Sequence, residues 1–521
     1  MEPSAEISTE NSAEPGEFGY QQELRRVLRL FAVFSVAFSV VSITTGIFLN
    51  YAFGITHLGP LSIWLWPVAA VGQTLVALIL AELSTRIPLA GANYQWAARL
   101  VGPRYGYLVG ALGIMYSAVG MPGILLLGAS PLLITALGGD ASDTRLQFAV
   151  AVALIVVAFG INIVSVQLAA RVNTVAVVTE IVGTVVLAVL LFGLFVGHAK
   201  PVGHGFEILG QYATQPGQSL FYGIVLASLI GVYTLVGFEA AADMGEETVD
   251  ARRTIPKAIL LSVIVSGVLG MITLIGFTVA IPDTATIGSA EVPLAEISTY
   301  WLGSGLTSVF LLVVVFSMFA LTVVAAAASA RLIYAMARDN MLPGSKLLRG
   351  VSAGRQTPLP ALVTSLVICL ALMSYGYLNG NAFGTLVGAT ALIPYVVYFL
   401  TVLAYGARRH RLDRLPGAFH LGQWAMPVFV LAVIWLLTAL AALILPSAFR
   451  DAVWVTLGGL VLAGVWYVVG LRGRLRDGTA GPPRLPDAAN TAGNTAGNTA
   501  GNTAGNTATT DTTTNVIEES A

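Results

Sequence analysis

Twelve blocks of apolar residues, each about as long as a membrane-spanning helix, constrain the fold of this chain more than any other feature. A helix needs roughly 20 apolar residues to cross about 30 Å of hydrocarbon. Polar turns separate the blocks, which lie at residues 30–53, 61–81, 106–137, 146–166, 174–197, 219–240, 258–281, 306–330, 359–378, 384–406, 425–446 and 452–471. The pattern predicts an all-α membrane protein with twelve transmembrane helices.

Composition and charge placement point the same way. Hydrophobic residues make up 56% of the 521 residues and charged residues 10%, against about 25% charged residues in soluble domains. The 26 Lys and Arg residues lie outside all the blocks, and with a cytoplasmic N-terminus only Arg145, Lys200 and Arg450 fall in outer connections. Because cytoplasmic loops are enriched in Lys and Arg, we expect a multi-pass protein of the cell (inner) membrane with both termini in the cytoplasm.

The blocks occupy one central domain between two polar tails. Residues 1–29 and 472–521 predict disordered cytoplasmic tails, and Ala-Gly-Asn-Thr repeats over 489–508 of the second tail. The first block is too long for a signal peptide and eleven more follow it, so we expect it to stay in the protein. The domain at 30–471 divides into about 30–197, about 219–406 and two appended helices at about 425–471.

The first and sixth blocks are interrupted at comparable places, by SITTGIF at 42–48 and LVGFEAAADMG at 235–245. Broken helices are tolerated in a membrane only where they line an enclosed or water-filled cavity. Corresponding breaks in two halves of a chain indicate the midplane site of an inverted-repeat transporter, with blocks 1–5 and 6–10 as the repeats. The alternative is that Gly46 and Gly237 only allow close helix packing.

Four stretches resemble signatures of the amino acid-polyamine-organocation (APC) permease superfamily. They are ITTGIF at 43–48, AELSTRIPLAGANYQWAARLVG at 81–102, GFEAAADMGEETVDARRTIPKAI at 237–259 and SARLIYAMARDNMLP at 329–343. The match extends over roughly residues 25–471, with Thr44 standing where a glycine is usual, and is closest in form to the branch handling amino acids, 4-aminobutyrate (GABA) and choline. The resemblance implies a LeuT-type 5+5 inverted repeat with helices 1 and 6 broken, two appended helices, and substrate held at the breaks.

The two breaks supply the predicted substrate site. An unwound first helix exposes N–H groups and the positive end of the following half-helix to a substrate carboxylate, and the second break leaves carbonyls for an ammonium group. The aromatic rings of the second break add apolar and cation–π contact, and the resemblance matches Tyr233 to an aromatic gate. The alternatives are hydroxyls bonded to their own backbone and aromatics that only pack. We assign the site to Ser42, Thr44, Thr45, Gly46, Tyr233, Val236, Gly237 and Phe238.

Glu180 and Glu239 are the only acids or bases inside the twelve blocks. Charged groups at membrane depth are costly and usually functional, and a carboxyl there can exchange a proton, so we assign both residues to proton coupling. By the resemblance, Glu180 stands where several proton-coupled relatives have lysine. The alternatives for Glu180 are cation binding, pairing with a cationic substrate, or a permanently neutral acid.

Further acids lie near the ends of two blocks. Asp243, Glu246 and Asp250 follow Glu239 at i+4, i+7 and i+11, which predicts either an acidic inner pathway or a solvated helix end. Glu82 precedes Arg86 by four residues and predicts an interfacial ion pair or gate.

Together these features predict a secondary active importer of an amino acid or a related zwitterion such as 4-aminobutyrate. Proton coupling is favoured over sodium coupling, for which Ser317 and Thr322 are the loose ligand candidates. An amine, choline or polyamine carrier of the same fold and a non-transporting nutrient sensor stay open as alternatives. The five histidines lie in connections and no HExxH or nucleotide-binding glycine loop occurs, while the single Cys369 excludes an intramolecular disulfide. We therefore expect neither an enzyme nor a cofactor.

Overall fold

The computed structural model describes residues 15–283, 287, 292–352, 354, 356–379, 382–411 and 418–483, with the backbone alone for 382–389 and 411. Within these ranges the chain is helical, with one isolated backbone bridge between Leu28 and Thr248. Residues 22–482 form one compact unit, and η2 (Pro15–Phe18) belongs to a second, small unit. The predicted all-helical class is confirmed.

The helices of the first part of the compact unit begin and end as follows. They are α1 (Leu30–Val41), α2 (Ile43–Leu58), η3 (Gly59–Trp64), α3 (Leu65–Arg86), α4 (Ala92–Leu100), α5 (Pro103–Ile124), η4 (Leu125–Ala129), α6 (Ser130–Ala136), α7 (Thr144–Val164) and α8 (Val166–Val196). After a short connection come η5 (Phe206–Gly210), α9 (Leu220–Ala227), α10 (Leu229–Val232), α11 (Ala240–Asp243) and η6 (Gly245–Glu247).

The remaining helices are mostly long. They are α12 (Ala251–Val279), α14 (Pro293–Arg338), α15 (Ser345–Leu348), α16 (Leu359–Leu378), α17 (Ala382–Arg408), η7 (Arg409–Arg411), η8 (Gly422–Trp424), α18 (Ala425–Ile444), η9 (Ser447–Phe449), α19 (Arg450–Trp466), η10 (Tyr467–Leu471) and α20 (Arg472–Arg476). Helix α14 is interrupted once, at Gly303, where the backbone leaves helical geometry.

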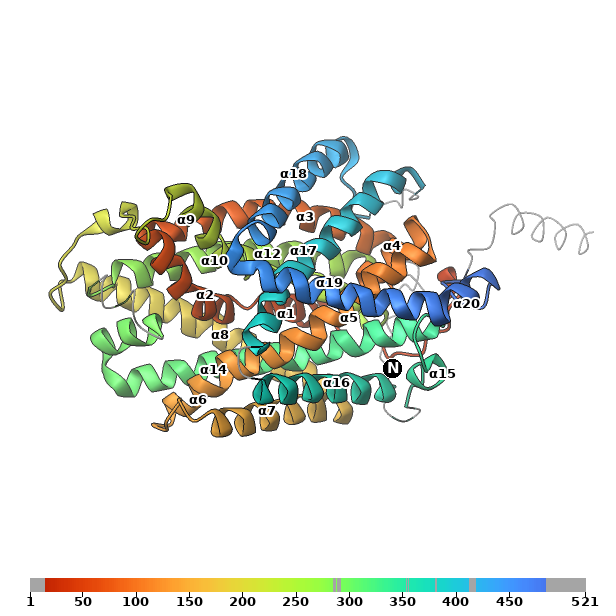
Figure 1. The fold of residues 1–521 in the computed structure, drawn as a ribbon, viewed down its shortest axis with the longest axis horizontal. Helices are drawn as coiled ribbons and strands as arrows, with labels where there is room; N and C mark the ends of the chain where they lie inside the picture. The colour runs from red at the N-terminus through yellow and green to blue at the C-terminus, as the bar shows by residue number, and fades with distance from the viewer. Residues whose placement is uncertain are drawn as a thin grey trace, which may run out of the picture. The chain divides into compact units, whose positions relative to one another are not determined.

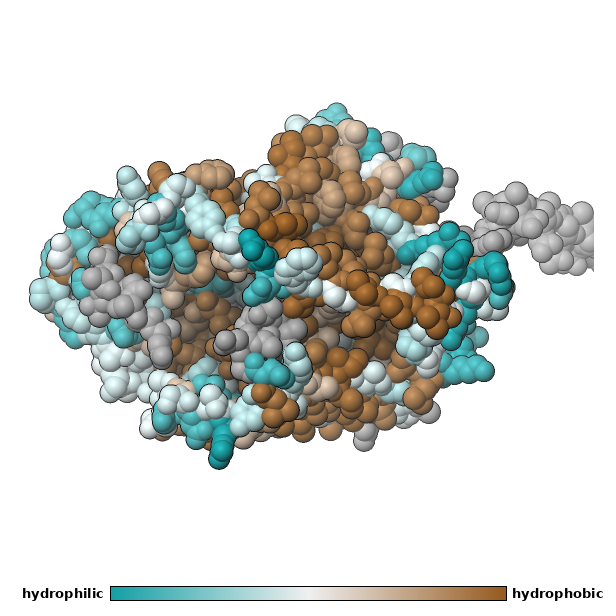
Figure 2. Space-filling model, viewed as in Figure 1, coloured by the Kyte–Doolittle hydropathy of each residue, from teal (hydrophilic) through white to brown (hydrophobic). Residues whose placement is uncertain are grey.

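Ten helices or helical runs in the described part of the chain are long and apolar enough to cross a membrane. The blocks predicted at 30–53 and 61–81 both fall within the run Leu30–Arg86, and the block at 219–240 contains the shorter apolar helix Leu220–Val232. Within residues 22–482 most long helices lie along one direction (Figure 1). Hydrophobic residues gather across the middle of this unit and hydrophilic residues toward its two ends (Figure 2), as in a multi-pass membrane protein.

The two predicted interruptions correspond to two places where the helical backbone stops. Helix α1 ends at Val41, Ser42 adopts a left-handed conformation with φ 37° and ψ 89°, and α2 begins at Ile43. Between α10 and α11 the residues 233–239 are not helical, and Gly237 has φ +89°. A Cβ atom at Gly237 would lie 2.3 Å from Cγ1 of Val40, so both the backbone angle and the packing require glycine there.

Segments next to the predicted tails have contacts with the helical unit. Leu28, within the predicted N-terminal tail, receives a backbone hydrogen bond from Val249 (2.9 Å) and donates one to Glu247 (3.0 Å). Beyond the last block, the Arg474 guanidinium donates to the carbonyls of Asn340 (3.3 Å) and Leu342 (3.2 Å). The part of the C-terminal tail from residue 484 onward lies outside the described residues.

Small residues allow the central helices to approach closely. A Cβ atom at Gly270 on α12 would lie 2.0 Å from Cζ2 of Trp66 on α3, and the Trp66 indole is fixed by its hydrogen bond to the Gly267 carbonyl (2.9 Å). Without a hydrophobic effect between helices in lipid, such close packing is a main source of helix association.

Gly270→Ala is therefore expected to lower the Tm of the detergent-solubilised protein, because overpacking a fitted interface costs about 1–3 kcal/mol. The measurement is thermal unfolding beside Gly160→Ala, a control in α7 where an added Cβ meets nothing within 4 Å. The control should be neutral or slightly stabilising, since Ala favours helices by about 1 kcal/mol over Gly. An unchanged Tm in Gly270→Ala would contradict the close α3–α12 packing.

Candidate functional site

A cavity of about 60 Å³ lies where the two interrupted helices meet. Thr45 and Gly46 line it from the first turn of α2, and Tyr233, Thr234 and Val236 line it from the break between α10 and α11. The breaks touch there, because a Cβ atom at Gly46 would lie 2.1 Å from the side chain of Thr234. Residues of α1, α5, α14 and α17 complete the wall, among them Val40, Tyr116, Leu321 and Thr390. Among the described residues of this lining there is no Asp, Glu, His, Lys or Arg.

A second cavity, of about 70 Å³, shares part of its wall with the first. The shared residues are Val40, Tyr116, Ser117 and Ala325. Unlike the first cavity, the second is lined by two acids, Glu239 and Asp243, and by Asn93. We call the first the apolar cavity and the second the acidic cavity.

Glu180 of α8 lies outside both cavities and binds the start of α2. Its Oε1 accepts hydrogen bonds from the Thr44 backbone N–H (3.1 Å), the Thr44 hydroxyl (2.8 Å) and the Ser42 hydroxyl (3.3 Å). Its Oε2 accepts from the Ser317 hydroxyl of α14 (2.6 Å). The carboxyl is 1% exposed, so three helices converge on a fully buried acid.

Helix geometry explains why an acid fits at this point. The first N–H groups of a helix have no intrahelical acceptor, and the helix dipole makes that end favourable for negative charge. In α2, Glu180 satisfies the N–H of Thr44, and the Ser42 Oγ lies 3.4 Å from the N–H of Thr45. Ser42 and Thr44, predicted as substrate ligands, therefore face Glu180, whereas Thr45 and Gly46 face the apolar cavity.

Two tyrosines of α17 satisfy backbone groups at the second break. The Tyr395 hydroxyl donates to the Val232 carbonyl (3.0 Å) and accepts from the Gln73 amide (2.7 Å). The Tyr398 hydroxyl accepts from the Gly237 N–H (2.7 Å) and donates to the Glu239 carboxylate. The tyrosines thus connect α17 to both ends of the non-helical segment.

The other residues predicted for the second break lie close to this pair. Tyr233 and Val236 line the apolar cavity and Gly237 lines the acidic one. Phe238 lines neither, and its ring stacks on that of Tyr398 with centroids 5.2 Å apart.

Sequence reasoning missed Tyr395 and Tyr398 and gave Ser317 only as a loose sodium ligand. The sequence does carry a signal for the two tyrosines, which lie three residues apart in the otherwise apolar stretch YVVYFL at 395–400. A buried phenol usually needs a hydrogen-bond partner, so this pair indicates polar contacts inside the helix bundle.

Glu82 lies apart from both cavities. Its Oε2 accepts hydrogen bonds from the Tyr405 hydroxyl (2.8 Å) and the Leu421 N–H (3.4 Å), and Arg86 is 4.0 Å away. Glu82 lies outside the wall of the acidic cavity, and its role as an interfacial ion pair or gate stays a prediction.

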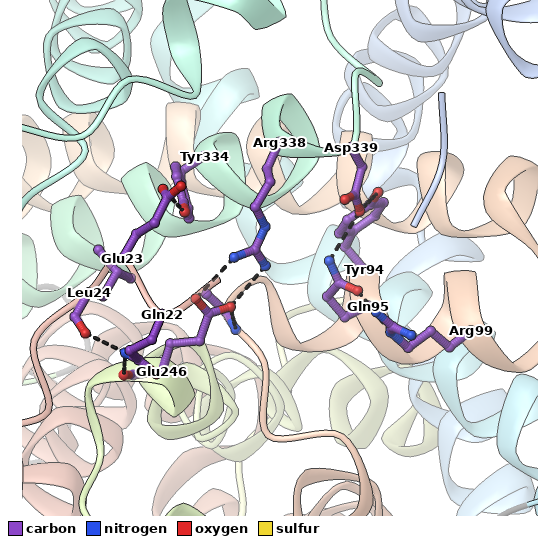
Figure 3. A network of polar contacts seen from close by, with 11 residues as sticks. Gln22, Glu23, Leu24, Tyr94, Gln95, Arg99, Glu246, Tyr334, Arg338 and Asp339 are labelled. Carbon is purple, nitrogen blue, oxygen red and sulfur yellow. Dashed lines mark hydrogen bonds and ion pairs between the residues drawn. The ribbon is translucent and has the colours of Figure 1, made fainter. Parts of the chain in front are cut away.

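Acids next to the second break form buried ion pairs with α14. Arg338 donates two hydrogen bonds to Glu246 (3.0 and 2.9 Å), and Arg331 donates two to Glu247 (2.7 and 2.8 Å). In Figure 3 the Arg338 side chain reaches the Glu246 carboxylate, while Tyr334 from the same helix reaches Glu23 (2.6 Å). Glu246 is 2% exposed, so the alternative of a solvated helix end does not describe it.

Comparison with known proteins identifies the family. Residues 28–468 match the family model described as amino acid permease. An amino-acid permease of Arabidopsis thaliana is 28% identical, with 83% of this chain and 88% of the relative covered. A GABA-specific permease of Saccharomyces cerevisiae is 25% identical (87% and 83% covered), and a thiamine transporter of Schizosaccharomyces pombe is 24% identical (83% and 80%). The predicted resemblance to APC permeases is confirmed. The family is a class of transporters and not a class of enzymes, as predicted.

Tyr398→Phe is expected to destabilise the protein and reduce transport. The change leaves the Gly237 N–H without its acceptor and Glu239 without its donor, and an unsatisfied buried group costs about 1–3 kcal/mol. Thermal unfolding and substrate uptake into proteoliposomes measure both effects. Tyr375→Phe, at a residue that is 53% exposed on α16, is the matched control and should change neither. Wild-type uptake in Tyr398→Phe would remove this tyrosine from the site.

Proposed function

Since the chain belongs to the amino acid permease family, we propose that it is a secondary active transporter importing an amino acid or a related zwitterion such as 4-aminobutyrate, coupled to protons. The observation that carries the proposal is the apolar cavity, where the turn containing Thr45 and Gly46 meets the non-helical segment of Tyr233, Thr234 and Val236. Relatives named as amino-acid and GABA permeases support the substrate class.

The two sides of the apolar cavity suit the two ends of a zwitterion. A substrate carboxylate lies at the positive end of α2, beside the Thr45 hydroxyl. That hydroxyl is 2.6 Å from the Ser42 Oγ and turns from Ser42 to donate to the carboxylate. The ammonium group lies against the carbonyls of residues 233–236, beside the Tyr233 ring. Because Glu180 already engages the Thr44 N–H, we assign Thr45 and Gly46 to the substrate, and Ser42 and Thr44 to the coupling group.

The architecture in this proposal is a LeuT-type fold with twelve spans in the cell membrane. The run Leu30–Arg86 supplies spans 1 and 2, and α9 to α11 supply a broken span 6. The Lys and Arg distribution supports cytoplasmic termini.

Proton coupling is assigned to Glu180 because of its position. Protonation removes the negative charge that faces the start of α2 and changes the hydrogen bonds that Ser42, α2 and α14 make to Glu180. A group that binds three elements at once favours one arrangement of those elements, so its proton occupancy biases the conformational equilibrium.

A cationic amine is the second candidate substrate. The acidic cavity places Glu239 and Asp243 in one wall, and two acids favour a ligand with positive charge. A relative named as a thiamine transporter supports this candidate. Net uptake of either substrate by proteoliposomes would separate both candidates from a non-transporting sensor.

Glu180→Gln is expected to abolish proton-driven uptake and to spare counterflow exchange. The amide keeps one acceptor for Thr44 but takes no proton in the physiological range. The measurement compares concentrative uptake under an imposed pH gradient with exchange at equal pH, and sodium replacement checks the ion. Concentrative uptake at the wild-type rate in Glu180→Gln would exclude Glu180 from coupling.

Thr45→Val is expected to weaken binding of a zwitterion about 10-fold, which corresponds to roughly 1.4 kcal/mol for a lost hydrogen bond. A thermal-shift screen of the purified protein with amino acids, 4-aminobutyrate, choline and polyamines measures it. Thr179→Val on α8, whose hydroxyl bonds its own helix at the Val175 carbonyl, is the control. If Thr45→Val binds the zwitterion as tightly as wild type, the assignment of Thr45 is wrong.

A further inference from the structure

A groove of about 590 Å³ lies between α3, α9, α10 and α18, whereas the apolar cavity holds about 60 Å³. Its walls include Val68 and Ala69 of α3, Val225 of α9, Val232 of α10 and Ala442 of α18. Neither the substrate site nor the acids assigned to coupling contribute to these walls. We call it the α9–α18 groove.

The α9–α18 groove opens on the surface that faces the hydrocarbon of the membrane. Phe221, Leu445 and Val68 line it and are 77%, 79% and 57% exposed. Hydrophobic residues cover α18 in the view of Figures 1 and 2. The hydrocarbon core of a bilayer contains no water, so the molecules that reach the groove are lipids.

The hydroxyls inside the α9–α18 groove are already bonded to their own helices. Ser228 donates to the Val225 carbonyl (2.7 Å), and Thr438 donates to the Ile434 carbonyl (2.9 Å). An occupant of the groove therefore meets mainly apolar side chains. Many weak dispersion contacts with such walls suit a hydrocarbon chain.

The length of the α9–α18 groove matches one leaflet of a bilayer. One wall extends along α9 and α10 from Tyr222 to Val232, and another along α18 from Pro446 back to Trp435. At 1.5 Å per residue, ten or eleven helical residues span about 15 Å, which is half of the roughly 30 Å of hydrocarbon. Tyr222 and Pro446 lie at helix ends, so the groove extends from the membrane surface toward the middle of the bilayer, as an acyl chain does.

The mouth of the α9–α18 groove carries groups that suit a lipid headgroup. The Tyr222 hydroxyl lies 3.4 Å from the Ser447 Oγ, and tyrosine is enriched at membrane interfaces. Arg450 follows Ser447 by three residues, one turn of a 3-10 helix. It is exposed and takes no part in the ion pairs of the described residues. A guanidinium in this position can bind a phosphate group.

We propose that the α9–α18 groove binds one acyl chain of a membrane phospholipid whose headgroup phosphate pairs with Arg450. The bound chain packs on α9 and α10. The helical backbone stops after Val232, and helices as short as these depend on packing from their sides, so the bound lipid stabilises the folded protein. The inference goes beyond the proposed function, because lipid binding is measured without transport.

Ala442→Phe tests the groove, because a phenyl ring on its wall takes the space of the acyl chain. Delipidated wild-type protein in detergent, titrated with palmitoyl-oleoyl phosphatidylglycerol, should bind one lipid by native mass spectrometry and gain thermal stability. Ala442→Phe should weaken this binding about 10-fold or more, since displacing roughly two CH₂ groups removes that much affinity. Ala153→Phe, at an exposed position of α7 outside the groove, is the matched control and should bind as wild type.

Arg450→Gln tests the headgroup contact. It should bind phosphatidylglycerol more weakly than wild type, because the phosphate loses its cationic partner. Arg145→Gln at the start of α7 removes another positive charge away from the groove and should leave the binding unchanged. Equal binding by wild type and Arg450→Gln would contradict the proposed position of the headgroup.

A labelling experiment on the wild-type protein decides even if Ala442→Phe does not fold. A phosphatidylglycerol with a diazirine in the middle of one acyl chain should label α9 and α18, at residues such as Val225 and Thr438. Labelling spread evenly over other lipid-facing helices, or wild-type binding by Ala442→Phe, overturns the proposal. A sterol that binds in preference to phospholipid, or a dimer that Ala442→Phe dissociates, would assign the groove to a different occupant and overturn it as well.

Discussion

Every peptide group buried in hydrocarbon needs a hydrogen-bond partner, and the rest of this structure depends on how that need is met at two interrupted helices. At the first interruption the partner is the Glu180 carboxyl, which accepts from the Thr44 N–H. At the second, the hydroxyls of Tyr395 and Tyr398 bind the Val232 carbonyl and the Gly237 N–H. The interruptions therefore persist because other helices hold them, and any movement of α8 or α17 acts on the backbone that surrounds the apolar cavity.

The sequence predicts the elements of this arrangement better than their partners. Helical blocks follow from apolar length, the interruptions follow from SITTGIF and LVGFEAAADMG, and the two acids stand out because charges are rare at membrane depth. Ser317 and Tyr398 carry no such signal, since single hydroxyls are common in membrane helices. They lie 137 and 159 positions from the acids they bind, and only packing brings such distant residues together.

Spacing along the chain is informative only while the helix continues. Glu246 lies seven residues after Glu239, which would place both on one face of an unbroken helix. Helix α11 ends at Asp243, however, and the turn η6 directs Glu246 and Glu247 to different arginines, two turns apart on α14. Buried carboxylates of this kind require paired charges, so their burial depends on residues of a distant helix.

The wall common to the two cavities has a mechanical consequence. Val40, Tyr116, Ser117 and Ala325 line both the apolar cavity and the acidic cavity. A bulky solute in either cavity contacts the same four side chains, so it reduces the volume of the other cavity. In the proposed transport cycle, a solute that moves from one cavity to the other therefore has to displace these four residues.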